Sequence, residues 1–306
     1  MRKTTGILLA TASLLSLSAC AAGGTAACDD GVPLGGLAAT IVSDGGFDEA
    51  PAPAQFPTPL VVDAPSRAIT MPGDGRLVRA GDAVSAKVTL FKGADGTLID
   101  GGDILLFDND PALPLLAAST CAPVGSRVVT AAPAEDLLGS FAPNFGVEAG
   151  DTVVAVLDIQ AAFPGHPSGV TVDAIPGLPA VVTAPNGQPG LTFNGDPAPA
   201  ELTVETLVQG NGDVVQAGDT IIVNYTGVEW ETRKVFDSSW TTGRPASFSL
   251  DNVVPGFQQA VIGQRTGSRI LVAIPPSEGY GDSAGSPVGP ESTMLFVIDL
   301  LGVAAG

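Results

Sequence analysis

Two short segments bring aromatic rings and a carboxylate close together in the sequence. Tyr225 ends the alternating apolar run 221–225, which is typical of the buried face of a β-strand. Gly227 follows, where the backbone needs freedom to leave the sheet. Phe236 and Asp237 then place a ring and a carboxylate side by side. The two segments therefore place two aromatic rings and one carboxylate within 12 positions of each other (237 − 225).

The composition argues against several other kinds of site. The only histidine, His166, lies in a Pro/Gly-rich stretch, where a solvated linker residue is far more common than a ligand or a catalyst. Without a second histidine or a CxxC motif, we expect no hydrolase triad, zinc site or thioredoxin site. Thirteen Lys and Arg against 32 Asp and Glu give a formal net charge of −19, which repels nucleic acid and anionic headgroups. We therefore expect no metal, no cofactor and no nucleic-acid partner.

A series of motifs surrounds the two segments. In order, they are Tyr225-Thr226-Gly227, Phe236-Asp237-Ser238-Ser239, Phe248-Ser249-Leu250, Val253-Val254-Pro255-Gly256-Phe257, Gly267-Ser268-Arg269, Ile274-Pro275-Pro276, Gly279-Tyr280-Gly281 and a closing strand through Phe296. No single motif is decisive, but their common order is specific. Over roughly Glu201 to Val303 the chain resembles the FKBP-type peptidyl-prolyl isomerases, the rapamycin-binding immunophilins.

The resemblance implies roles for nine pocket residues. Catalytic roles fall to Tyr225, Phe236, Asp237 and Tyr280, and substrate-binding roles to Phe248, Val253, Val254, Phe257 and Phe296. Tyr280 would donate a hydrogen bond to a substrate carbonyl, Asp237 would polarise the twisted imide, and the Tyr225 hydroxyl would fix Asp237. The resemblance also implies binding of macrolide immunophilin ligands. Phe257 stands where many members have Trp, and Ala246 where the position is often aromatic, which bears on substrate preference and drug affinity.

The reaction of this family suits such a pocket. Rotation about an X–Pro bond is slow because amide resonance raises a barrier of about 18–20 kcal/mol. Water stabilises the resonant amide, so an apolar aromatic pocket favours the twisted form without a nucleophile or proton transfer. A purely structural alternative is that Phe248, Phe257 and Phe296 are ordinary core residues. Against it, the set contains both tyrosines of a chain that is only 5% aromatic.

The elements around these residues are mostly strands. Residues 202–207 and 269–274 alternate, and 294–301 places Met294, Phe296, Ile298 and Leu300 on one face and Leu295, Val297 and Leu301 on the other. Only 254–263 suggests a helix, with Pro at its start and Gly at its end. We therefore predict an α+β fold, a twisted antiparallel sheet wrapped around one short helix, which is the FKBP fold.

The chain contains this pattern twice. Ala80-Gly81-Asp82 parallels Ala217-Gly218-Asp219, and Thr97 to Asp100 parallels Lys234 to Asp237, both 137 positions apart (219 − 82 and 237 − 100). Gly125 to Val129 likewise parallels Gly267 to Leu271, and Thr152 to Asp158 parallels Thr293 to Asp299. The first copy has Val88 in place of Tyr225, Ile99 in place of Phe236 and no counterpart of Tyr280. We interpret it as a degenerate, non-catalytic repeat, most simply a spacer.

The N-terminus has the features of a bacterial lipoprotein signal. Arg2 and Lys3 precede an uncharged apolar stretch that is too short to span a bilayer. It ends in Leu17-Ser18-Ala19-Cys20, which resembles a lipobox and implies a diacylglycerol on Cys20. Cleavage after Ala19 without lipid is the alternative. Cys28 and Cys121 are then left, either as a disulfide or as two free thiols.

The expected organisation is a signal peptide (1–19), a lipid-anchored tether (20–59) with an extended Pro/Ala-rich stretch at Ala50 to Pro59, a degenerate FKBP-like domain (60–162) and an FKBP-type isomerase domain (174–306). Phe163 to Asp173 is the expected linker, and 180–183 with the turn at Asn186-Gly187 should add edge strands to the second domain.

The predicted function is isomerisation of X–Pro bonds in proline-containing exported or unfolded polypeptides, outside the cytoplasm at the bacterial cell membrane. The alternative is a binding module or holdase chaperone in which turnover is incidental. Loss of isomerisation in Phe236 or Asp237 variants, with client protection retained, would separate the two functions.

Overall fold

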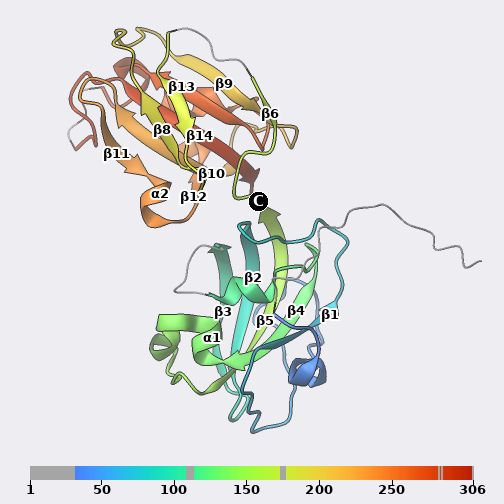
Figure 1. Cartoon of the computed structure of the whole chain (residues 1–306). Helices are drawn as coiled ribbons and strands as arrows, with labels where there is room; N and C mark the ends of the chain where they lie inside the picture. Colours follow the sequence, from blue (N-terminus) through green and yellow to red (C-terminus); the bar gives the residue numbers. More distant parts are fainter. Residues whose placement is uncertain (1–31, 108–113, 173–176, 282, 284, 305–306) are drawn as a thin grey trace, which may run out of the picture.

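The computed structural model describes residues 32–304 except 108–113, 173–176, 282 and 284. Two antiparallel sheets, each with its own hydrophobic core, form the two lobes of Figure 1. We call them the N-terminal domain (32–163) and the C-terminal domain (170–304). No helix in these described ranges is long and apolar enough to cross a membrane. The predicted α+β class, antiparallel sheets with a few short helices, is confirmed.

Five strands form the sheet of the N-terminal domain. They are β1 (Ser66–Met71), β2 (Ala83–Lys92), β3 (Leu98–Phe107), β4 (Arg127–Pro133) and β5 (Thr152–Phe163), hydrogen-bonded in the order β1-β4-β5-β2-β3. Three short helices, η2 (Pro114–Ala118), α1 (Ala134–Leu138) and η3 (Gly139–Phe145), share one core with this sheet. Aliphatic side chains such as Val88, Leu115 and Leu138 fill that core.

The C-terminal domain has the corresponding strands in the corresponding order. They are β9 (Thr203–Gln209), β10 (Thr220–Glu229), β11 (Lys234–Ser238), β13 (Arg269–Ile274) and β14 (Met294–Val303), in the order β11-β10-β14-β13-β9. Two short strands are added: β6 (Val170–Thr171) pairs with β9, and β12 (Ala246–Ser249) pairs with the beginning of β10. Without them, the path matches that of the first sheet strand for strand.

The helix α3 (Pro255–Val261) lies against the C-terminal sheet as expected from the sequence. Pro255 occupies its first turn, where a missing N–H costs nothing. Phe257, Ala260 and Val261 are buried in the core that also holds the predicted front face of β14. Gly256 allows the close approach, because a Cβ there would lie 2.5 Å from Cγ2 of Ile274. The short helices α2 (Ser239–Thr242), η4 (Leu250–Asn252) and η5 (Pro276–Glu278) complete the domain.

Each sheet contains one buried ion pair between neighbouring strands. In the N-terminal domain, Arg127 Nε and Nη2 donate to the two oxygens of Asp158 at 2.6 and 2.7 Å. In the C-terminal domain, Arg269 does the same to Asp299 at 2.5 and 2.7 Å. All four side chains are almost completely buried. Because an unpaired buried charge is strongly destabilising, each ion pair fixes the register of its two strands.

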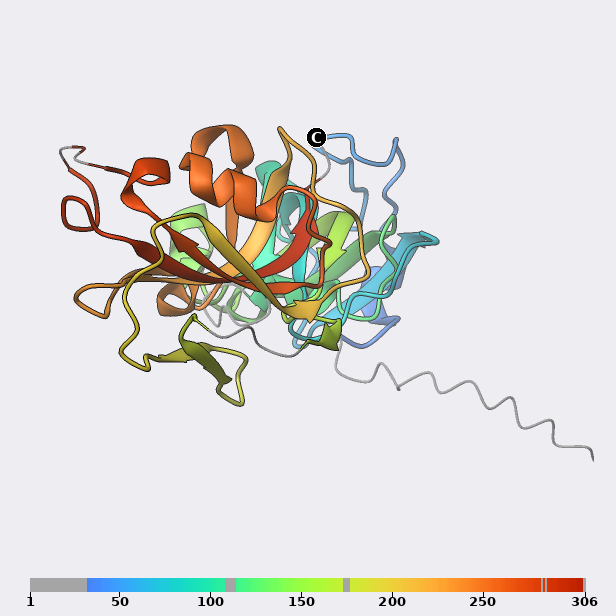
Figure 2. The same ribbon diagram turned by 90° about the horizontal axis from the view of Figure 1, so that it is seen from above.

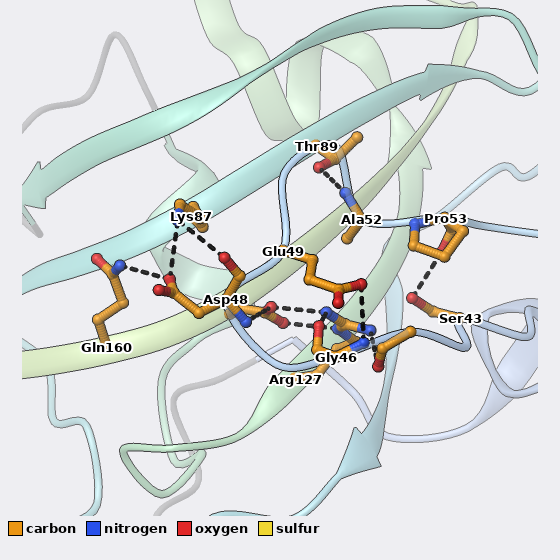
Figure 3. A network of polar contacts seen from close by, with 12 residues as sticks. Ser43, Gly46, Asp48, Glu49, Ala52, Pro53, Lys87, Thr89, Arg127 and Gln160 are labelled. Atoms are coloured by element: carbon orange, nitrogen blue, oxygen red, sulfur yellow. Dashed lines mark hydrogen bonds and ion pairs between the residues drawn. The ribbon is translucent and has the colours of Figure 1, made fainter.

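A hairpin-like segment precedes β1 in the N-terminal domain and β9 in the C-terminal domain. In each domain it packs on the back of the sheet, which is the face opposite the main core, and it binds this arginine. In the N-terminal domain, Arg127 Nη2 donates to the carbonyl of Gly46 at 2.7 Å, and Asp48 N–H donates to Asp158, as Figure 3 shows. In the C-terminal domain, Arg269 Nη2 donates to the carbonyl of Gly187 at 2.8 Å. The same chemistry thus anchors both covering segments.

The prediction of an extended tether up to residue 59 is wrong for its described part. Residues 36–40 form the helix η1 (Gly36–Thr40), and Ala38, Ile41 and Ala52 are buried against the back of the sheet. Ala52 N–H donates to the Thr89 hydroxyl at 2.9 Å. The Pro/Ala composition resembles a linker, but small apolar residues also pack closely on a sheet. Residues 20–31, with Cys20 and Cys28, lie outside the described residues.

Two further boundaries differ from the prediction. The expected linker from Phe163 to Asp173 is shorter than predicted, because Phe163 ends β5 in a buried position and Val170–Thr171 form β6 of the second sheet, which leaves 164–169 outside any helix or strand. The hairpin of β7 (Ala180–Thr183) and β8 (Pro189–Thr192) forms a sheet of its own rather than adding edge strands. Its apolar side chains pack on the back of the second sheet, around Trp230.

The two domains meet through a small apolar contact. Ala83 and Phe163 of the N-terminal domain pack against Ile222 and Leu301 of the C-terminal domain. The Phe163 ring lies on the backbone of Gly302, where a Cβ would be 1.9 Å from Cδ1 of the ring. In the view from above, Figure 2, the C-terminal domain lies in front of the N-terminal domain.

Cys121 is disulfide-bonded. Since the other two cysteines, Cys20 and Cys28, lie outside the described residues, the pairing of Cys121 with Cys28 stays a prediction.

We predict that Arg269→Met lowers the free energy of unfolding of the C-terminal domain by about 3–5 kcal/mol, because Asp299 is left as an unpaired buried charge. Both tryptophans, Trp230 and Trp240, lie in this domain, so their fluorescence during urea unfolding follows it. Arg79→Met, at an exposed position, should change this free energy by less than about 0.5 kcal/mol. Equal urea midpoints for the two variants would contradict the structural role of the pair.

Candidate active site

A cavity of about 350 Å³ opens on the front of the C-terminal sheet. Its walls come from β10, β11, β12, the start of α3, β14 and the loop between β13 and β14. The lining residues are Tyr225, Phe236, Asp237, Phe248, Asn252, Val253, Val254, Phe257, Tyr280, Pro287 and Phe296. The structure thus brings together all nine residues that the sequence analysis selected. It adds Asn252 and Pro287, which no motif singled out.

Four phenylalanines form the apolar part of the cavity through edge-to-face contacts. Phe257 contacts Phe296 with ring centroids 5.5 Å apart and ring planes at 86°. Phe236 meets Phe296 at 5.5 Å and 85°, and Phe248 meets Phe257 at 6.0 Å and 80°. Such geometries are favourable for aromatic pairs beyond simple burial. Each ring is held by another ring, so the cavity walls are stiff.

A β-bulge explains how Phe236 and Asp237 can both line the cavity. Neighbouring residues of a regular strand face opposite sides of a sheet. Here Gly227 is paired with Asp237, but the register shifts at the next pair, and Phe236 is the extra residue of the bulge. Gly227 also provides space, because a Cβ there would lie 2.7 Å from Phe236 and 2.8 Å from Phe296.

Asp237, the one carboxylate among the described residues that line the cavity, is held by a tyrosine. Tyr225 Oη donates a hydrogen bond to Asp237 Oδ2 at 2.5 Å. Tyr225 is buried, whereas Asp237 is exposed at the cavity mouth. Burial and the bond to Asp237 both raise the pKa of Tyr225 above its ordinary value. The phenol therefore keeps its proton and acts as a fixed donor.

Two serines fasten the segment that carries Asp237. Tyr225 N–H donates to the Ser239 hydroxyl at 3.0 Å, and the Ser238 hydroxyl lies 3.1 Å from that of Thr226. Ser238 also caps α2 by accepting the N–H of Trp240 at 3.3 Å. The sequence analysis quoted both serines as part of a motif but gave them no role.

Tyr280 stands apart from these contacts, at the rim. Its side chain is 38% exposed and follows η5 in the loop between β13 and β14. Gly279 before it permits tight packing, because a Cβ there would lie 2.7 Å from Met294 Cε. This position suits a group that meets a ligand entering the cavity.

The matching positions of the N-terminal domain are filled with aliphatic side chains. Val88 stands in place of Tyr225, Ile99 in place of Phe236 and Ala155 in place of Phe296. Leu138 of α1 is buried where the other domain has the exposed Tyr280 loop. Ile99 is again the extra residue of a bulge, opposite the shift between Leu90 and Phe91. The strand order and the bulge are the same in both domains, but the N-terminal domain has aliphatic side chains at the positions of the aromatic rings.

No group of three or more His, Cys, Asp or Glu side chains is placed to hold a metal ion within the described part of the chain. The cavity itself offers hydrogen-bond donors and acceptors on an apolar background, which suits binding and orientation of a neutral group.

We predict that in Tyr280→Phe, which leaves Tyr225 as the only tyrosine, the phenol ionises well above the ordinary midpoint of about pH 10. The ultraviolet absorbance of tyrosinate against pH measures this midpoint. Adding Asp237→Asn removes the charge that opposes ionisation and should move the midpoint down. A midpoint near pH 10 in Tyr280→Phe alone would contradict the buried, hydrogen-bonded phenol.

The region that contains this site matches a known protein family. The family model described as FKBP-type peptidyl-prolyl cis-trans isomerase matches residues 212–301. The FK506-binding protein of Streptomyces anulatus is 38% identical over 120 residues, covering 38% of this chain and 97% of that protein. A probable FK506-binding protein of Corynebacterium glutamicum is 36% identical over 106 residues, covering 34% of this chain and 89% of that protein.

Among solved structures, FkpA from Escherichia coli shares 32% identity over 40% of this chain and 51% of that chain, with a TM-score of 0.32. The family model lies within the C-terminal domain, and the resemblance deduced from the motifs is confirmed. The chain belongs to the FKBP-type peptidyl-prolyl cis-trans isomerase family and is an isomerase of that type.

Proposed function

We propose that this isomerase rotates X–Pro bonds in the aromatic cavity of the C-terminal domain, and that its clients are exported polypeptides. The observation that carries the assignment is the Tyr225–Asp237 hydrogen bond at the edge of an otherwise apolar ring cluster. One fixed carboxylate beside four phenylalanines is an unusual environment for a simple core. The cavity is also large enough for a proline and its neighbouring carbonyl groups.

Desolvation supplies the main part of the proposed mechanism. Water hydrogen-bonds the planar amide and so favours its resonant form. In the cavity, Phe236, Phe257 and Phe296 surround the proline ring and exclude water, which lowers the cost of twisting the bond. The stiff ring cluster helps because it is already in place before the substrate arrives.

Polar groups then select the twisted state. Asp237 faces the cavity mouth, where its charge can stabilise the polarised imide. Tyr225 holds this carboxylate through a phenol that stays neutral. Tyr280 at the rim is placed to donate to a substrate carbonyl, and Val253 and Val254 line the approach. The same donors and rings would receive a macrolide immunophilin ligand.

We assign the N-terminal domain to a degenerate copy of the same fold, without isomerase activity. The strand order, the buried arginine–aspartate pair and the bulge position support a duplication. The aliphatic side chains at Val88, Ile99 and Ala155 support the loss of chemistry.

The catalytic test uses Phe236→Ala and Asp237→Leu in the full chain. We expect kcat/KM on a short X–Pro peptide to fall about tenfold to a hundredfold in Phe236→Ala, since a buried side chain contributes about 1.5–3 kcal/mol of contact. Asp237→Leu should reduce kcat with KM nearly unchanged. Phe141→Ala, an exposed phenylalanine of the N-terminal domain, is the matched control.

Rapamycin should inhibit the parent chain and bind Phe236→Ala more weakly. If both pocket variants keep their fold and their activity, this cavity is not the isomerase site. If they lose activity but still protect an unfolded client from aggregation, a holdase function accompanies or replaces catalysis.

We also propose that the mature chain is anchored outside the cytoplasm by a lipid on Cys20. The charged start, the apolar stretch and Leu17-Ser18-Ala19-Cys20 support this, and the disulfide at Cys121 fits an oxidising compartment. In a bacterial host, the chain should incorporate labelled palmitate and sediment with membranes, whereas Cys20→Ser should do neither. Label incorporation in Cys20→Ser, or none in the parent chain, would reject the anchor.

A further inference from the structure

A second cavity, of about 310 Å³, lies where the two domains meet. Gly81 and Asp82 line it from the N-terminal domain, and Gly165 and His166 from the junction between the domains. On the opposite wall are Asn224 and Ser239 of the C-terminal domain. These last two residues lie beside the active site, since Asn224 precedes Tyr225 and Ser239 closely follows Asp237.

A chain of hydrogen bonds runs along this wall. Asn224 Nδ2 donates to the carbonyl of Gly165 at 3.2 Å. The Ser239 hydroxyl donates to Asn224 Oδ1 at 3.2 Å and accepts the Tyr225 N–H at 3.0 Å. The amide of Asn224 therefore joins the junction to the backbone of the catalytic strand and to the segment that follows Asp237.

Asn224 can fix the positions of Tyr225 and Ser239 relative to the junction without contacting the substrate. Adjacent residues of β10 face opposite sides of the sheet, so Tyr225 faces the aromatic cavity while Asn224 faces the N-terminal domain. Asn224 is 6% exposed. A buried amide at this place must satisfy its donors and acceptor, which makes the two bonds interdependent.

The other end of the chain of bonds is also fixed. Gly165 lies so close to the turn before β2 that a Cβ there would be 2.0 Å from the carbonyl oxygen of Gly81. Two residues earlier, Phe163 packs on Gly302. The Gly165 carbonyl thus lies where the chain is held against the N-terminal domain at Gly81 and against the C-terminal domain at Gly302.

We propose that Asn224 and Ser239 are positioning residues of the isomerase, through which the N-terminal domain holds Tyr225 and Asp237 in their active arrangement. The degenerate domain is then part of the catalytic unit rather than a spacer. This inference rests on the aromatic cavity being the isomerase site.

The decisive variants are Asn224→Asp and Asn224→Ala in the full chain. A carboxylate at position 224 still accepts from Ser239, but it cannot donate to Gly165 and places two acceptors face to face. Asn224→Ala loses both bonds. Asn186→Ala is the matched control, because Asn186 lines the same cavity and its Oδ1 bonds only within its own turn, to Gln188 N–H.

We expect kcat to fall about three- to tenfold in both Asn224 variants, the range for one net hydrogen bond, with KM changed less than twofold, about 0.4 kcal/mol. Asn186→Ala should keep the parent values. Asp82, His166 and Arg244 line the same cavity, so the variant is compared with the parent chain at each pH. In Asn224→Asp, burial raises the pKa of the new carboxyl above about 3.9, so its protonated fraction grows as the pH falls from about 8 towards 5. The protonated group can donate to Gly165, so kcat relative to the parent chain should recover as pH falls.

A restored bond would also restore stability, so the tryptophan fluorescence of each variant is followed at the same pH values. Recovery of kcat in Asn224→Asp that is equally folded across this range, and its absence in Asn224→Ala, indicates positioning rather than destabilisation. The proposal is overturned if both Asn224 variants keep the parent kcat, if Asn186→Ala loses as much, or if Asn224→Asp shows no recovery at low pH. Phe236→Ala, run in parallel, tells the two assignments apart: if it also stays active, the cavity assignment has failed; if it loses activity while the Asn224 variants do not, only the present inference has failed.

Discussion

The buried pair of Arg269 and Asp299 constrains more of this fold than any other contact. It lies on the back of the sheet and joins β13 to the central strand β14 at one register. A slip of one residue would leave both charges unpaired in the interior and would turn Phe296 from the cavity to the opposite face. The same row of the sheet includes Asn224, which is paired with Asp299 across β10 and β14. The ion pair on the back of the sheet therefore fixes the register that puts the cavity residues on the front.

The arginines also explain why each sheet has a covering hairpin. An arginine has more donors than one carboxylate can accept, and a buried donor needs a partner. Turn carbonyls supply it in both domains, Gly46 for Arg127 and Gly187 for Arg269. An aromatic contact follows each turn, Phe56 with Phe91 and Phe193 with Trp230. The plan that the two domains share thus includes the covering hairpin, which precedes β1 in one domain and β9 in the other.

Much of the site could be predicted because it depends on local pattern. Alternation placed Tyr225 and Phe296 on the buried face, and ordered motifs brought the remaining cavity residues into one family pattern. The features that the sequence did not predict correctly are those that depend on packing between distant segments of the chain. Pro- and Ala-rich composition is common to flexible tethers and to tightly packed covers, and long-range contacts such as the bond from Ala52 to Thr89 distinguish them here. The bulge at Phe236 is similar, since an extra residue in a strand becomes visible only when the partner strand is known.

The two sheets follow the same plan, but their cores meet different physical demands. An open aromatic cavity leaves side chains without neighbours on one side, which costs stability. The N-terminal domain avoids that cost by placing Val88, Leu138 and Ala155 where the other domain keeps its rings and its rim tyrosine. Its position equivalent to Asn224 holds Lys87, which binds Asp48 of its own covering segment. The N-terminal domain has a filled core and its own internal bonds, so it is a suitable support for the C-terminal domain with its open cavity. Asn224 is the residue of the C-terminal domain that binds the junction between them, at the Gly165 carbonyl.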